Sequence, residues 1–312
     1  MPFSLDAEVA AVFAAAAKAG GPVPVTPRGD AIAMRDVFNA RVQLADAAEP
    51  DSPSVQTADH TLPVADGEIL VRWYTKDGSA PGSAVVYYHG GGMVCGSVDL
   101  YDRLVSKYVE ATGVPFLSVD YRLAPEYPGT TLVDDGHAAL AWFVEQADTL
   151  GVDKARIAIM GDSGGGGVAA GVAIAARNAR TPVAQQILIY PMLDDRTIEP
   201  DPEIEPFAIW TYDNNFTGWN ALLGANRGSE NVSALAAPSR LTDFAGLAPA
   251  FIDVGELDIF RDESILYALS LVRAGVSTEL HVRAGCPHGF DRMPAEVSAR
   301  AWADRYRAIL VV

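Results

Sequence analysis

The stretch "GDSGGGG", residues 161–167, follows the apolar run "RIAIM" and precedes the small-residue segment "VAAGVAIAAR". Counted from Gly161, it is a G-x-S-x-G pattern, which is typical of a tight strand-to-helix turn that presents a serine nucleophile. Counted from Gly164, it is G-x-G-x-x-A, a variant of the glycine loop that cradles a dinucleotide pyrophosphate. Both interpretations predict a strand, a tight turn and a helix around Ser163.

The position of this stretch favours the serine nucleophile. A dinucleotide-binding loop usually follows the first strand of its sheet, and an acidic residue follows about 20 positions later. Here at least two expected sheet strands come before Gly161, and "VAQQ", which lies at roughly that later position, contains no acid. We therefore interpret Ser163 as an attacking atom and expect no cofactor.

Two polar residues near the C-terminus can complete the chemistry. The run "APAFIDVG" leads to Asp258, and "TELHVRAG" leads to His288 in the loop "CPHGF". Ser163, Asp258 and His288 thus follow successive predicted strands on one sheet edge, in the order Ser, Asp, His. A serine hydroxyl needs an imidazole to take its proton, and a carboxylate must orient that imidazole. We predict that these three residues form a catalytic triad.

The other titratable residues fit less well. Asp253 lies inside its apolar run, while Glu256 and Asp262 remain less favoured alternatives to Asp258. His89 begins a glycine loop and is expected to hold that loop by hydrogen bonds. The remaining histidines are expected in structural roles, on strands or on a helix: His60, His137 and His281. No His, Cys and Asp cluster has the spacing of metal ligands, so we expect no metal site.

The elements that must position these residues have an α/β pattern. From residue 83, short apolar runs alternate with segments of helical period at 133–147, 164–177 and 262–274. This pattern predicts a parallel sheet that is covered on both faces, with ligands at the carboxyl ends of its strands. Upstream, "VQTADHTLPV" and "GEILVRWYT" are separated by Asp66-Gly67. They predict an antiparallel pair with a tight turn.

Two segments do not follow this alternation of strands and helices. Residues 1–50 look helical, and 196–235 is acidic, then aromatic, and too long for a simple connection. We expect one domain over 1–312, with a core at 55–195 and 236–312 and a cap built from the other two segments. Four aromatic residues of the cap are expected either to line a substrate pocket or to pack the cap onto the core: Trp210, Tyr212, Phe216 and Trp219.

The net charge of the chain disfavours two classes of binding partner. The 312 residues carry a net charge of −17, which disfavours binding to nucleic acid or to an anionic membrane. No apolar run approaches the ~20 residues that span a bilayer. The N-terminal "AEVAAVFAAAAKAG" is interpreted as an amphipathic surface helix, not a signal segment. Cys95 and Cys286, which lie near the expected site, are interpreted as reduced, packed thiols of a cytoplasmic protein.

Five motifs in order resemble one family. They are "HGGG" at 89–92, "DYRLAPEYP" at 120–128, "GDSGGG" at 161–166, "DIFRDE" at 258–263 and "HGF" at 288–290. Over roughly residues 55–310, the chain resembles the hormone-sensitive-lipase-like esterases, bacterial family IV of the α/β-hydrolase fold. The resemblance implies a mostly parallel sheet of about eight strands flanked by helices, with a helical cap. It also implies a serine carboxylesterase that works through an acyl-enzyme.

The resemblance also assigns roles to backbone and loop residues. Three consecutive glycines leave N–H groups unshielded, which also fits an ordinary glycine turn. In this family, the backbone N–H groups of Gly91, Gly92 and Gly164 would form an oxyanion hole. The family usually has alanine after the serine, but the Gly164 N–H remains available. Three residues of "DYRLAPE" would brace the site through ion pairs: Asp120, Arg122 and Glu126.

The function expected from these observations is hydrolysis of small, uncharged or weakly polar esters with short acyl chains. The same triad also fits amides, lactones or carbamates, since that choice depends on the cap. A non-catalytic small-molecule receptor of the same fold is disfavoured because His288 is present. The last strand, "TELHVRA", is expected at a sheet edge that can pair two copies into a homodimer.

Overall fold

An eight-stranded sheet forms the centre of the computed structural model, which describes residues 3–19, 26–78 and 82–312. The strand order is β1-β2-β4-β3-β5-β6-β7-β8, and β2 is antiparallel to β1 and β4, whereas the other neighbours are parallel. The strands are β1 (Val55–Val64), β2 (Gly67–Lys76), β3 (Ala84–Tyr88), β4 (Phe116–Val119), β5 (Ile157–Asp162), β6 (Gln185–Ile189), β7 (Ala250–Gly255) and β8 (Thr278–Arg283). The predicted mostly parallel α/β sheet is confirmed.

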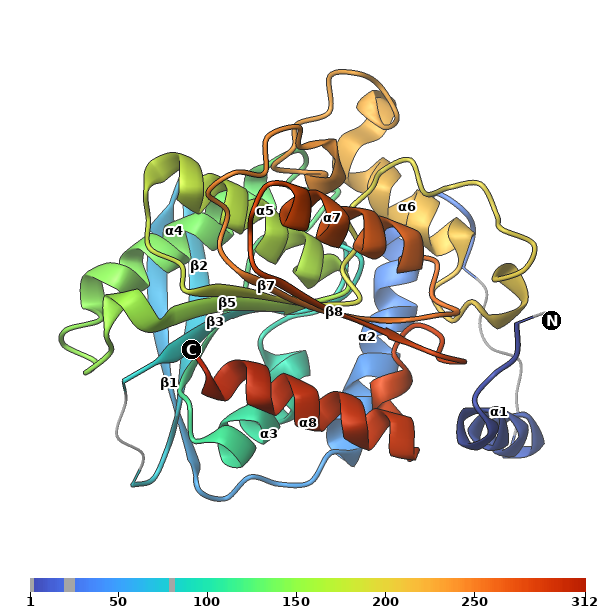
Figure 1. The fold of residues 1–312 in the computed structure, drawn as a ribbon, viewed down its shortest axis with the longest axis horizontal. Helices are drawn as coiled ribbons and strands as arrows, with labels where there is room; N and C mark the ends of the chain where they lie inside the picture. Colours follow the sequence, from blue (N-terminus) through green and yellow to red (C-terminus); the bar gives the residue numbers. More distant parts are fainter. Residues whose placement is uncertain (1–2, 20–25, 79–81) are drawn as a thin grey trace.

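Helices cover both faces of this sheet (Figure 1). One face carries α4, α5 and α7, and the other carries α3 and α8. The helices are α1 (Ala7–Ala19), α2 (Ala31–Ala48), α3 (Asp102–Thr112), α4 (Thr131–Gln146), α5 (Gly164–Ala179), α6 (Tyr212–Leu223), α7 (Arg261–Arg273) and α8 (Glu296–Leu310). The sequence pattern located α4, α5 and α7 to within a few residues, but α3 and α8 were not predicted.

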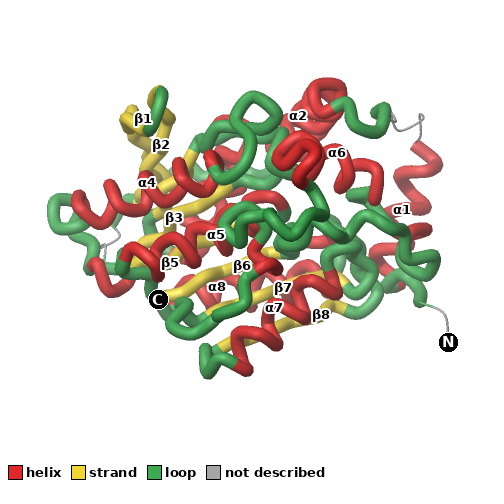
Figure 2. Tube along the Cα trace, turned by 90° about the horizontal axis from the view of Figure 1, so that it is seen from above, coloured by secondary structure: helices red, strands yellow, loops and turns green. Residues whose placement is uncertain are grey.

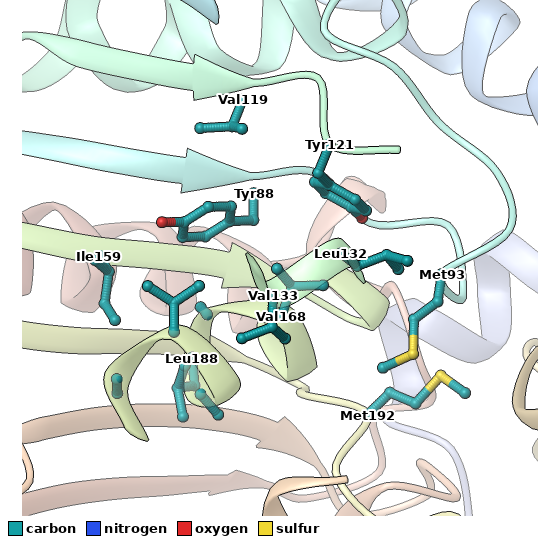
Figure 3. Close-up of a cluster of buried hydrophobic side chains, with 14 of the residues drawn as sticks. Tyr88, Met93, Val119, Tyr121, Leu132, Val133, Ile159, Val168, Leu188 and Met192 are labelled. Carbon is teal, nitrogen blue, oxygen red and sulfur yellow. The ribbon is translucent and has the colours of Figure 1, made fainter. Parts of the chain in front are cut away.

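The central strands are buried on both faces, which is why they read as continuous apolar runs. Every residue of β3, β4 and β5 is buried. Successive side chains point to opposite faces, so Val86 packs with α4 and α5 while Val85 packs with α3 and α8. Figure 3 shows the first of these two layers, where Leu188 of β6 lies near Val168 of α5 and Val119 of β4 lies further across the sheet.

Two details of the hairpin and the strand order differ from expectation. The register pairs Val64 with Gly67, so the turn residues are Ala65 and Asp66, and Gly67 already belongs to β2. Asp66 takes the left-handed conformation at φ 61°, whereas Ala65 before it does not. The strands that lead to the predicted triad are β5, β7 and β8, and β6 lies between the first two. They are therefore not successive, although all three end on the same edge.

Helices α2 and α6 lie together at one end of the molecule, beyond the carboxyl ends of the parallel strands (Figures 1 and 2). Arg35 fixes α2 there: its Nε donates to the carbonyl of Val94 at 2.6 Å, and its Nη2 donates to that of Ala124 at 2.8 Å. The same guanidinium forms a two-bond pair with Glu126, with both distances at 2.7 Å. Glu126 therefore ties the loop after β4 to a helix from the N-terminal segment.

The three "DYRLAPE" residues differ in their contacts. Arg122 forms a bidentate pair with the buried Asp135, and Glu126 pairs with Arg35. Asp120 instead accepts the backbone N–H of Val98 at 2.9 Å. The expectation of an ion pair at Asp120 was wrong. Its carboxylate binds a loop amide instead, and no Lys or Arg side chain in the described part of the chain pairs with it.

We expect Glu126→Gln to lower the free energy of unfolding by about 0.2–1 kcal/mol at pH 7, the usual range for exposed ion pairs. The hydrogen bond from Arg35 lowers the pKa of Glu126 to about 2. A depressed carboxyl pKa stabilises the fold above the unfolded value and loses that effect as pH falls toward the folded one. Urea unfolding of both proteins should therefore show the difference shrinking between pH 5 and pH 3. A difference that stays constant over this range would contradict the assignment.

None of the helices in the ranges given above is long and apolar enough to cross a membrane.

Candidate active site

Ser163 sits in a strained turn between β5 and α5. Its φ of 55° and ψ of −120° are unusual for a residue other than glycine, and such strain is typical of a nucleophile held at a strand-to-helix turn. Its N–H donates to the carbonyl of Ile189 at 2.9 Å, and its own carbonyl accepts from Met192 at 3.0 Å. A Cβ at Gly161 would overlap the backbone of Gly165. The two flanking glycines are therefore needed for the turn to close.

The structure brings Ser163, His288 and Asp258 together in one hydrogen-bonded chain. The Nε2 atom of His288 lies 3.0 Å from Oγ of Ser163, and its Nδ1 lies 2.6 Å from Oδ2 of Asp258. Asp258 is 1% exposed, and its other carboxylate oxygen accepts the N–H of Phe260. Edge-on contacts from Tyr190 and Phe260, at centroid distances of 4.6 and 5.2 Å, hold the His288 ring. This arrangement can carry a proton away from the serine hydroxyl.

The alternative acids are engaged elsewhere. Asp253 pairs with Arg283 and Arg305, Glu256 accepts the N–H of Gly285, and Asp262 pairs with Arg261 at the surface. Among the described residues, Asp258 is the only one of these four acids that forms a hydrogen bond with His288.

His89 holds the glycine loop, as the sequence led us to expect. Its Nδ1 lies 2.8 Å from the carbonyl of Gly90, and its ring stacks on Tyr121 at 4.3 Å between centroids. Burial lowers the pKa of His89, so its ring is neutral at pH 7. The other three histidines lie on β1, α4 and β8: His60, His137 and His281.

The glycine loop and the serine turn touch through their backbones. A Cβ on Gly164 would lie 2.7 Å from the backbone nitrogens of both Gly92 and Met93. Gly91 and Gly92 take φ values of 126° and 58°, which glycine adopts without strain. In the part of the chain that the structure describes, no hydrogen bond uses the N–H of Gly91, Gly92 or Gly164. Three backbone donors next to the serine are thus available to a ligand.

A cavity of about 240 Å³ opens at Ser163 and His288. Its wall combines the strand ends with α2 and with the loop before α6, and Trp210 contributes one side. The Trp210 ring packs edge-on against Phe38 of α2 at 5.1 Å and lies directly against Gly92, where a Cβ would overlap it. The cavity is lined by Phe38, Arg41, Val42, Ala45, Gly91, Tyr101, Asp162, Ser163, Tyr190, Ile209, Trp210, His288, Gly289 and Arg292.

The other three predicted aromatic residues do not line this cavity. Tyr212 borders a neighbouring cavity of about 300 Å³ between α2 and the start of α6. Phe216 lies under the guanidinium groups of Arg28 and Arg227, at 4.1 and 4.6 Å from its centroid. Trp219 is fully buried in the core. The four aromatic residues therefore divide between the two alternatives: Trp210 lines the cavity at Ser163, Tyr212 borders the neighbouring cavity, and Phe216 and Trp219 pack against other parts of the protein.

The sequence analysis missed the residues that α2 contributes. Phe38 and Arg41 come from a helix whose apolar pattern carries no catalytic signal, so only the fold places them beside Ser163. Arg292 was also missed, although it lies four positions after His288 in the chain.

Both cysteines are free and buried. Burial raises the pKa of Cys95 and of Cys286 to about 12, so each stays a protonated thiol at neutral pH. Such thiols are poor nucleophiles, which agrees with the interpretation that they pack inertly. Within the described ranges, no group of three or more His, Cys, Asp or Glu side chains is arranged to hold a metal ion.

The family model for the alpha/beta hydrolase fold matches residues 85–292, which include the serine turn, Asp258 and His288. This chain belongs to the α/β-hydrolase family. Its sequence relatives agree: this α/β hydrolase is 35% identical over 253 residues to an ethyl acetate hydrolase of Pseudomonas putida, covering 79% of the chain and 78% of the relative. It is 37% identical over 223 residues to a carboxylesterase of Mycobacterium tuberculosis, covering 70% of each protein.

Solved structures lead to the same conclusion. The α/β hydrolase superposes on a bacterial heroin esterase with a TM-score of 0.89 at 35% identity, covering 98% of this chain and 97% of the other. A hyperthermophilic esterase from the archaeon Pyrobaculum calidifontis gives a TM-score of 0.83 at 31% identity, covering 100% and 99%. The resemblance to the hormone-sensitive-lipase-like esterases is therefore confirmed, and the α/β hydrolase is a carboxylic ester hydrolase.

Proposed function

We propose that this enzyme hydrolyses esters through an acyl-enzyme on Ser163. The contacts that join Ser163, His288 and Asp258 at 3.0 and 2.6 Å carry this proposal. The serine oxygen attacks the ester carbonyl while Nε2 of His288 takes its proton. Asp258 keeps the imidazole in the required tautomer and stabilises the imidazolium. His288 then protonates the departing alkoxide, and water repeats the sequence to release the acid.

The tetrahedral intermediate places a negative charge on the former carbonyl oxygen. The unpaired N–H groups of Gly91, Gly92 and Gly164 are the donors that we assign to it, because they meet beside Ser163. Donors fixed in the backbone need no reorganisation as the charge develops, which makes such a site effective.

We propose short acyl chains as the preferred substrates. The cavity at Ser163 has about 240 Å³, below the ~300–1,000 Å³ typical of pockets for drug-sized ligands. Phe38 and Trp210 close it on the side that faces α2. A curated relative is an ethyl acetate hydrolase, and that name denotes an ester with a two-carbon acyl group.

We also propose the division into core and cap. Residues 55–195 and 236–312 would form the catalytic core, and the cap would comprise residues from 1–50 and 196–235. The observation that favours this division is that α2 and the loop before α6 supply cavity walls but no strand of the sheet.

β8 lies at the sheet edge with Val282 40% exposed, and we propose that this edge pairs two copies of the chain.

A series of p-nitrophenyl esters tests the acyl-chain preference. We expect acetate and butyrate to be hydrolysed with a kcat/KM about 100-fold above that of palmitate, because a chain that overfills a closed pocket loses binding in the transition state. Initial rates should be measured below the solubility limit of each ester, with a detergent control. Equal kcat/KM values for butyrate and palmitate would contradict the proposal for short acyl chains while leaving the esterase reaction intact.

A further inference from the structure

Two arginines line the cavity at Ser163. Arg41 comes from α2, and Arg292 comes from the short 3-10 helix Phe290–Arg292 that follows the His288 loop. The chain as a whole has 40 acidic residues against 23 basic ones. Among the described residues that line the cavity, Asp162 is nevertheless the only acid. The wall therefore has a positive balance of charge inside a strongly acidic protein.

Among the described residues, the half-buried Arg292 lacks the hydrogen bonds to carboxylates that Arg305 has. Its Nη1 atom is buried and makes no hydrogen bond in the described part of the chain. Its guanidinium carbon lies 5.6 Å from the ring centroid of Tyr101, another cavity residue. Arg305, in contrast, is fully buried and is held by Asp253 and Asp291. Solvent does not reach this Nη1 atom, so an acceptor in the cavity would meet the other donors of the Arg292 guanidinium, which form no hydrogen bond in the described part of the chain.

Two nearby acids, Asp291 and Asp162, interact with the charge of Arg292 but form no hydrogen bond with it in the described part of the chain. Asp291 is bound by Arg305 at 2.6 Å and by the hydroxyl of Tyr190 at 3.0 Å. Asp162 accepts the hydroxyl of Tyr87. No ion pair within the described ranges includes Arg41 or Arg292.

We propose that the substrates of this enzyme are small esters that carry a second, ionised carboxylate, which Arg292 binds with help from Arg41. A guanidinium matches a carboxylate with two parallel hydrogen bonds, which are about twice as strong as neutral ones. The cavity of about 240 Å³ requires that carboxylate to lie within a few atoms of the ester. This inference rests on the proposed reaction at Ser163, and it departs from the uncharged or weakly polar esters that the sequence led us to expect.

The carboxylate can belong to either half of the ester. On the acyl side, the substrate is a half-ester of a short dicarboxylic acid, and water converts it to the dicarboxylate and an alcohol. On the alcohol side, it is an acylated hydroxy acid, and water converts it to a short carboxylate and the free hydroxy acid. Both reactions are ester hydrolyses, and neither needs a reactant besides water.

Matched pairs of esters test the proposal with the wild-type enzyme. Monomethyl succinate and methyl levulinate differ mainly in an acyl-side carboxylate against a methyl ketone. Acetoxyacetate and acetoxyacetone differ in the same way on the alcohol side. We expect at least one anion to exceed its neutral counterpart about tenfold in kcat/KM, the lower end for one charge-assisted hydrogen bond. The preferred pair shows which half carries the charge.

Variants identify the residue responsible. In Arg292→Gln, the anion-to-neutral ratio of kcat/KM should fall about tenfold, mainly through a higher KM for the anion, and Arg292→Lys should restore part of it. Arg41→Gln, at a partly exposed position, should lower the ratio by a smaller factor, and it still tests the proposal if Arg292→Gln does not fold. Arg273→Gln, which removes an exposed charge at the end of α7, is the control and should leave the ratio within twofold.

The outcomes separate the two proposals. If neutral esters are hydrolysed and neither anion is preferred, or if the ratio is unchanged in both Arg292→Gln and Arg41→Gln, the carboxylate proposal is overturned and the esterase reaction stands. If none of the four esters is hydrolysed by the folded wild-type enzyme, the proposed reaction at Ser163 is itself contradicted.

Discussion

Replacing Ser163 with alanine is expected to lower kcat for a short ester at least about 10⁴-fold. The substitution removes only the hydroxyl that lies 3.0 Å from Nε2 of His288. Without it no acyl-enzyme forms, and the remaining rate comes from water attack assisted by the backbone donors. The turn itself should survive, because hydrogen bonds of the Ser163 backbone, not of its side chain, join it to Ile189 and Met192.

Initial rates on p-nitrophenyl butyrate, together with circular dichroism of both proteins, measure this effect. Ser270→Ala is a matched control, since the Ser270 hydroxyl on α7 donates only to the carbonyl of Leu266 one turn earlier. Its kcat should stay within about twofold of wild type, as for other substitutions away from the site. A folded Ser163→Ala protein that keeps a tenth of the wild-type kcat would show that another residue is the nucleophile.

The second large effect concerns stability: Arg305→Leu is expected to lower the free energy of unfolding by about 3–5 kcal/mol, the range for breaking a buried ion pair from one side. Arg305 on α8 is fully buried between Asp253 of β7 and Asp291. Leucine fills part of the volume but leaves both carboxylates buried without this partner. Asp291 also binds Tyr190, which packs against His288, so a fall in kcat should accompany the loss of stability.

Urea unfolding at several pH values tests this expectation. Although burial opposes ionisation, the charges of Arg305 and Arg292 hold the pKa of Asp291 below its usual value. The stabilisation from a lowered carboxyl pKa is present above the unfolded value of about 3.9 and is lost as pH falls below it. The difference between wild type and Arg305→Leu should therefore be largest near pH 7 and smaller at pH 3.5.

Arg307→Leu, two residues further along α8, is the control for this stability prediction. Its side chain is 50% exposed and pairs with Glu279 at the surface. Exposed pairs of this kind contribute about 0–1 kcal/mol. Equal losses of stability for the two variants would refute the buried network as a major source of stability.

The central sheet and the serine turn could be predicted because their signals are local. Buried parallel strands must be apolar on both faces, so β3, β5 and β7 appear directly as apolar runs. The turn at Ser163 requires small residues on both sides, and only glycine at positions 161 and 165 leaves room for the neighbouring backbone. The proximity of Ser163, Asp258 and His288 then follows from the rule that the carboxyl ends of parallel strands meet on one edge of the sheet.

The cavity walls could not be predicted in the same way. Trp210 and Trp219 have the same side chain, lie nine residues apart and are both buried, yet only Trp210 of the two borders the cavity. Their difference depends on how α6 docks against α2, which no short pattern encodes. The same is true of Arg305, since a surface helix is expected to expose its arginines and only the packing of α8 on β7 shows that this one is buried.

The assembly of the cavity from distant segments has a consequence during protein synthesis. Phe38 and Arg41 leave the ribosome well before His288 and Arg292. At typical translation speeds, the segment between Arg41 and His288 takes roughly 12–50 s to make. During that time the growing polypeptide comes to contain Ser163, the proposed nucleophile, but lacks His288, the proposed base. Turnover of a coloured ester during cell-free expression should therefore report only chains that extend past His288, and a truncation before position 288 should give no signal.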